Sequence, residues 1–183
     1  ARGDKFDTFP CFSADGNSIF YCVADSLLLP DQVMDIRYDL LQARFDADSG
    51  RIGEQVDTVW SGSAHNASVC HPKASPDGRW LLFSVADYGT FPLFHTETTL
   101  YLTDLSNGET RPLDEIKGDK SDSYHSWSSN SRWFVFASKR GDGSYGKPYF
   151  CHLDADGRTT KPFVLPQKSP RFYIYNLKSF NDL

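Results

Sequence analysis

A nine-residue pattern occurs three times in this chain of 183 residues and constrains the fold more than any other feature. Each copy begins with serine, has Asp or Asn two positions later, and ends in a short apolar run. The copies align without gaps and cover residues 13–21, 75–83 and 128–136. Repeats at this spacing indicate a structure built from similar supersecondary units that stack on one another.

The first four residues of each copy have the chemistry of a tight turn. In Ser75-Pro76-Asp77-Gly78, the serine suits position i of a type I turn, the proline position i+1 and the glycine position i+3. Glycine accepts a left-handed conformation that would cost another residue about 1–2 kcal/mol. The third copy has Asn130-Ser131 instead of Asp-Gly, so we expect its turn to be the most strained.

An apolar strand follows each turn, with hydrophobic side chains on both faces. Leu81 and Phe83 would face one side of such a strand, and Trp80 and Leu82 the other. A strand that is apolar on both faces lies between stacked layers rather than at a solvated surface. A second hairpin signal follows in each copy, at Asp48-Ser49-Gly50, Asn107-Gly108 and Asp156-Gly157.

Each repeat therefore predicts four antiparallel strands in about 50 residues, which is typical of one blade of a β-propeller. We predict an all-β fold, a partial β-propeller of about three four-stranded antiparallel blades. Residues 1–183 would form a single partial propeller domain, with blades at about 5–60, 64–116 and 121–167. The alternation over 31–45 favours a strand over a helix. The tail at 168–183 would be extended and pack on blade edges, or donate a strand to another blade.

The sequence also resembles a known family. Residues 75–84, SPDGRWLLFS, resemble the repeat of TolB-type β-propellers, and Phe136–Gly143 resemble the strand end and charged loop that follow it. Phe9–Ser13 resemble an incoming blade strand, and 124–167 resemble the last blade of TolB-like proteins of Bacteroidetes. The resemblance implies a six-bladed ring. The chain departs from the family pattern at Asn130-Ser131 and in the insertion 25–35.

Three blades do not close a ring of six. An uncovered blade face would expose roughly a few hundred Å² of apolar surface, which at about 25 cal/mol per Å² costs on the order of 10 kcal/mol. We therefore expect the chain to be a fragment of a longer protein, with a protein partner or a second copy covering its open faces. The net charge of −5 argues against nucleic-acid binding, and no apolar stretch is long enough for a membrane span.

Two functions remain open from the sequence. The resemblance implies a non-enzymatic TolB-like propeller that acts as a periplasmic or cell-envelope binding or protein-interaction scaffold. The alternative is the accessory propeller of a prolyl-oligopeptidase-like hydrolase whose catalytic domain lies outside these residues. The chain lacks a Gly-x-Ser-x-Gly motif, and Gly141–Gly146 matches Gly-x-Gly-x-x-Gly without the helix that a phosphate site needs. We predict no catalytic residues and no cofactor.

The first strand of each blade lines the central channel of a propeller, where polar residues could form a binding mouth. The candidate ligand-binding residues near these strands are His65, His71, Asp122, Tyr124 and His125. The alternative is structural, with the imidazoles and the phenol satisfying backbone groups around a water-filled channel.

Two further groups of side chains are candidates for a functional role. Lys139, Arg140 and Asp142 would form an exposed loop that either contacts a partner or is simply solvated. The four cysteines include two Cys-His pairs, but adjacent side chains on a strand point to opposite faces and cannot chelate one ion. We expect buried free thiols and no metal site.

Overall fold

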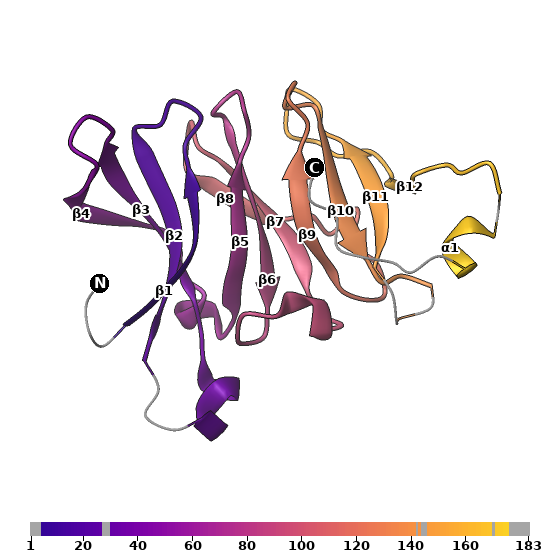
Figure 1. Ribbon diagram of the computed structural model, residues 1–183, viewed down its shortest axis with the longest axis horizontal. Helices are drawn as coiled ribbons and strands as arrows, with labels where there is room; N and C mark the ends of the chain where they lie inside the picture. Colours follow the sequence, from indigo (N-terminus) through magenta and orange to yellow (C-terminus); the bar gives the residue numbers. More distant parts are fainter. Residues whose placement is uncertain (1–4, 27–29, 142, 144–145, 170, 176–183) are drawn as a thin grey trace.

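In the computed structural model, three four-stranded antiparallel sheets stand side by side in chain order, as Figure 1 shows from indigo to orange. The structure describes residues 5–26, 30–141, 143, 146–169 and 171–175. The all-β, three-bladed prediction is confirmed, and the ring is not closed in this chain.

Each sheet is one blade whose strands follow one another in sequence. Blade 1 contains β1 (Lys5–Phe12), β2 (Ser18–Asp25), β3 (Asp39–Asp46) and β4 (Arg51–Trp60). Blade 2 contains β5 (Ser68–Ala74), β6 (Trp80–Ala86), β7 (Thr99–Asp104) and β8 (Glu109–Pro112). Blade 3 contains β9 (Asp122–Trp127), β10 (Trp133–Ser138), β11 (Lys147–His152) and β12 (Phe163–Val164). The first strands lie next to one another, since β5 contacts both β1 and β9.

The repeated turn has the same hydrogen bonds in all three blades. The serine hydroxyl accepts the amide N–H of the residue five positions later, at 2.9 Å in blades 1 and 2 and 3.2 Å in blade 3. The same hydroxyl donates to the Asp or Asn side chain two positions later, at 2.6, 2.5 and 2.7 Å. In blade 1 the hydrogen bond from Ser13, together with hydrogen bonds from Asn17, lowers the pKa of Asp15 to about 2. Serine and Asp or Asn are thus both needed to close the turn.

The third turn carries the expected strain. Gly16 and Gly78 have φ of 72° and 75°, and Ser131 occupies the same left-handed region at 57°. The hydroxyl of Ser131 accepts the amide N–H of Asp77 at 2.9 Å and so ties the turn of blade 3 to that of blade 2. A glycine would relieve the strain but could not make this bond.

The two faces of each blade have different neighbours, which we call the rear face (toward the preceding blade) and the front face (toward the next). Leu81 and Phe83 on the rear of blade 2 pack in one core cluster with Phe20 and Leu40 of blade 1. On the front of blade 2, Trp80 and Leu82 belong to a second cluster, which blade 3 completes with Phe134 and Phe136. Blade 2 is therefore covered on both sides.

Two regions differ from the expected extended structure. Residues Pro30–Asp35 form a 3-10 helix, η1, so the alternating pattern becomes a strand only from Asp39 onward. In the described part of the tail, Phe172–Tyr175 form a one-turn helix, α1, and the rest of the tail lies outside the described residues. All four cysteines are free thiols, three of them buried and Cys11 half-buried.

The positive φ of the turn glycines leads to a stability prediction. We expect Gly16→Ala to lower the free energy of unfolding by about 1–2 kcal/mol, because alanine is strained at this φ although no atom lies within 4 Å of the added methyl group. Gly53→Ala in β4 is the matched control, since its φ is not positive and its nearest neighbours are at 3.5 Å. Urea denaturation measures both. Equal stabilities for the two variants would contradict the role of the turn.

Candidate functional site

The first strands of the three blades share a distortion that the sequence did not predict. Phe9, His71 and Tyr124 each lie four residues before the turn serine, and each has a positive φ, of 53°, 54° and 48°. The strand pairing shifts register at the same place in all three blades. A left-handed, non-glycine residue at a bulge stores strain, and such positions are frequent at functional sites.

These three side chains form a stack that we call the inner aromatic column. The ring centroids of Phe9 and His71 are 4.3 Å apart, and those of His71 and Tyr124 are 4.7 Å apart. The distortion thus gathers one ring from each blade along the innermost strands. Two of the predicted ligand-binding residues, His71 and Tyr124, are brought together here.

His125 follows the column but is fully buried. Its Nε2 lies 2.9 Å from the carbonyl oxygen of Leu82, which can only accept, so Nε2 carries the proton. Burial, with His71 nearby, lowers the pKa of His125 to about 3, and burial, with Lys73 nearby, lowers that of His71 to about 4. Both rings are therefore neutral at pH 7. The buried Nδ1 atom of each ring has no hydrogen-bond partner among the described residues.

His65 and Asp122 lie in different surroundings. His65 ends the short helix η2 (Ser63–His65), where its ring stacks on Trp60 at 4.5 Å and its Nδ1 lies 2.7 Å from the carbonyl oxygen of Ser61. Asp122 is buried at the start of β9, where its carboxylate accepts the amide N–H of Gly118 at 2.7 Å and is held by Arg140. The structure places neither side chain in the inner aromatic column.

Arg140 connects blade 3 to the segment after blade 2. Its Nη2 donates to both carboxylate oxygens of Asp122, at 2.9 and 3.0 Å, and to the carbonyl oxygen of Ile116 at 2.9 Å. The guanidinium also lies 4.6 Å from the ring centroid of Tyr149. Arg140 is thus engaged within the chain. Of the other two predicted loop residues, Lys139 is described below and Asp142 lies outside the described residues.

Exposed apolar side chains lie on the β2–β3 and β6–β7 loops at one end of the blades, and we call these side chains together the loop-end surface. It consists of Val33 and Met34 in η1 and Phe91 and Phe94 in the β6–β7 loop, where η3 (Pro92–Phe94) lies. Phe94 is 75% exposed, and the Nζ of Lys139 lies 5.4 Å from its ring centroid. Both short helices lie at the lower end of Figure 1.

The two loops of this surface are joined to each other. The amide N–H of Gly89 donates to the carbonyl oxygen of Ile36 at 3.1 Å, and the guanidinium of Arg37 lies 6.0 Å from the ring centroid of Tyr88. In the sequence, the insertion 25–35 is visible only as a departure from the repeat. The run Phe91-Pro92-Leu93-Phe94, at the corresponding place in blade 2, is the signal that could have identified this surface.

Two kinds of feature are absent from the described residues. No group of three or more His, Cys, Asp or Glu side chains in that part of the chain could hold a metal ion. None of the helices formed by those residues combines the length and apolar character needed to cross a bilayer.

Comparison with solved structures identifies the class of fold. TolB from Acinetobacter baumannii matches with a TM-score of 0.52 and 18% identity, over 86% of this chain and 32% of that chain. A puromycin-hydrolyzing peptidase from Mycobacterium tuberculosis matches with a TM-score of 0.60 and 16% identity, over 90% and 24%. An oligogalacturonate lyase in complex with manganese matches with a TM-score of 0.57 and 11% identity, over 89% and 43%.

The chain has a TolB-like β-propeller fold, which is what these likenesses show. It spans between 24% and 43% of the length of the three structures. No protein-family model and no curated protein matches it.

The Arg140–Asp122 pair leads to a prediction about stability. We expect Arg140→Met to lower the free energy of unfolding by about 3–5 kcal/mol, because the Asp122 carboxylate would remain buried without its cation. Lys139→Met is the matched control at the neighbouring position, and we expect little change from it. Chemical denaturation distinguishes the two. A fully stable Arg140→Met protein would show that the pair contributes nothing to the fold.

The two buried imidazoles predict acid sensitivity. Because their pKa values in the folded state lie below the ordinary value of 6.5, the unfolded chain binds more protons below pH 6.5. The free energy of unfolding should therefore fall as the pH drops from 6.5 toward 4, by up to about 1.4 kcal/mol per pH unit for each ring. Urea midpoints between pH 7 and 4.5 measure this slope. We expect His125→Gln to reduce the slope of stability against pH, and the surface control His65→Gln to leave the slope unchanged. An unchanged slope in His125→Gln would contradict the assignment of His125 as a buried neutral imidazole.

Proposed function

We propose that this chain belongs to a non-enzymatic, TolB-like propeller that acts as a protein-interaction scaffold in the periplasm or cell envelope. The observation that carries the proposal is the loop-end surface, where Met34, Phe91 and Phe94 are all exposed. Aromatic residues and methionine are enriched at protein interfaces. Phe91 and Phe94, with ring centroids 6.3 Å apart, form an exposed apolar pair of the kind that marks binding sites. The two loops lie at the same end of neighbouring blades and are joined by the Gly89–Ile36 hydrogen bond, so one partner could contact both.

The chemistry of the surface favours a particular kind of partner. Phe91 and Phe94 offer apolar area, and Lys139 adds one cation over the ring of Phe94. A protein segment with apolar anchors and an acidic group would match both features. The inner aromatic column offers a second place for ligand contact, at the rings of Phe9, His71 and Tyr124.

A second candidate function is the accessory propeller of a prolyl-oligopeptidase-like hydrolase. The likeness to the puromycin-hydrolyzing peptidase, and to a prolyl endopeptidase structure with a TM-score of 0.54, favours it. The reading frame of the gene separates the two candidates, because a hydrolase domain encoded with these residues would establish the second.

The loop-end surface can be tested with paired variants. We expect Phe91→Ser combined with Phe94→Ser to abolish the capture of a specific partner from an envelope extract, measured by quantitative mass spectrometry against the unchanged chain. The control is Asn107→Asp in the β7–β8 hairpin at the other end of blade 2, which should capture as the unchanged chain does. The proposal is contradicted if the double variant and the control capture the same proteins in the same amounts.

A further inference from the structure

Among the described residues, two blade faces have no neighbouring blade, whereas the corresponding faces at the two junctions between the blades are covered. The front of blade 1 meets the rear of blade 2, and the front of blade 2 meets the rear of blade 3. The rear of blade 1 and the front of blade 3 are the two halves of a third such junction. They are separated only because the ring is open.

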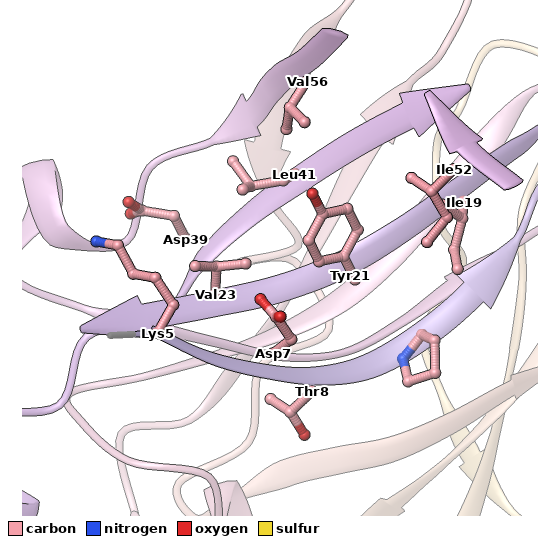
Figure 2. A pocket seen from close by; sticks show the side chains of 11 residues that line it. Lys5, Asp7, Thr8, Ile19, Tyr21, Val23, Asp39, Leu41, Ile52 and Val56 are labelled. Atoms are coloured by element: carbon pink, nitrogen blue, oxygen red, sulfur yellow. The ribbon is translucent and has the colours of Figure 1, made fainter. Parts of the chain in front are cut away.

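The rear face of blade 1 is apolar and hollowed. Its cavity of about 560 Å³ is lined mainly by side chains in cross-strand register on β2, β3 and β4. Figure 2 shows Tyr21 at its centre, with Leu41, Ile19 and Ile52 around it and Lys5 and Asp39 at one end.

Phe12 lies on the rear face of blade 1 and can be compared with its equivalent in blade 3. In blade 3 the equivalent residue, one position before the turn serine, is Trp127. Trp127 donates its Nε1–H to the carbonyl oxygen of Lys73 in the preceding blade at 2.9 Å. Phe12 has no preceding blade and is 51% exposed. Phe12 is therefore an exposed aromatic at the position where Trp127 connects blade 3 to the blade before it.

The front face of blade 3 is aromatic. Val135, Phe150 and Phe163 lie in register across β10, β11 and β12, and Trp133 lies 6.2 Å from Phe163 between ring centroids. Phe163 is 44% exposed, and the adjoining Leu165 is also exposed. A second cavity, of about 440 Å³, adjoins this face at Trp133, Val135 and Phe150 and extends past the inner edge of the blade to Pro76 of blade 2.

We propose that a second copy of this chain covers both faces, with the front of blade 3 of each copy packed on the rear of blade 1 of the other. At both junctions within the chain, a front face packs against a rear face. We therefore expect the two copies to pack front against rear in the same way, and not front against front or rear against rear. Two copies of three blades make six, within the range of closed propellers. A head-to-tail contact forms a closed ring when repeated rotation returns to the first copy. Here the rotation would be about a two-fold axis along the channel.

The pairing would also complete the inner aromatic column. Within the described residues, Phe9 of blade 1 and Tyr124 of blade 3 lie on the two outer blades of the column. In the closed ring, Tyr124 of each copy would neighbour Phe9 of the other, and the channel would be lined all the way round. This inference is independent of the loop-end surface, which lies on a different part of the blades.

The head-to-tail polarity can be tested with charges on one face at a time. The rear-blocked variant carries Phe12→Asp and Val56→Asp, and the front-blocked variant carries Phe163→Asp and Leu165→Asp; all four positions are exposed, so the fold should be retained. By light scattering at micromolar concentration, we expect the unchanged chain at twice 20.7 kDa and each variant alone at 20.7 kDa. Mixing the two variants should restore a dimer, since one intact junction remains between them.

The control is Asn107→Asp, a surface charge away from both faces, which should stay dimeric. Circular dichroism and the urea midpoint verify that each blocked variant is folded. A monomeric unchanged chain would overturn the proposal, as would a blocked variant that is dimeric alone, because that result would mean pairing between like faces. A mixture that stays monomeric while the unchanged chain is dimeric would also overturn the head-to-tail arrangement.

Discussion

The apolar character of both faces of the second strand in each blade determines the rest of this structure. Phe20, Leu82 and Phe83 are each almost fully buried, and burial on both sides of a sheet requires a neighbouring sheet on both sides. Stacking of the blades follows from this requirement. The front and rear faces carry different residues, so each blade packs its rear face on the front face of the blade before it. The repeated serine turn holds each of these strands against its inner neighbour at the same register.

The open ends and the candidate sites follow from the same stacking. Blade 2 is covered on both faces by its neighbours, whereas blades 1 and 3 each have one apolar face that no other described blade covers. Stacking also brings the innermost strands together, so that one ring from each blade joins the inner aromatic column. The long β2–β3 and β6–β7 loops gather at one end for the same reason. Binding surfaces therefore arise where the regular blades meet or end.

The fold could be predicted from the sequence because its signals are local. Glycine, asparagine and aspartate at the turns, with strands that are apolar on both faces, predict the blades without any long-range information. Ser131 even carries the strain expected from its missing glycine. The site was harder to predict. The pairing of Arg140 with Asp122 joins two segments that only the folded chain brings together, so Arg140 could not be distinguished from a solvated loop charge. None of the three left-handed residues, Phe9, His71 and Tyr124, is a glycine. Only their fixed spacing from the turn serine could have identified them in the sequence.

Native-state amide hydrogen exchange tests the central requirement most directly, because it reports how deeply each strand is covered. The account predicts that the amides of β6, covered on both faces, exchange only through global unfolding, while those of the exposed edge strand β4 exchange through local opening. Equal protection of β6 and β4 would contradict the claim that stacking between blades holds this protein together.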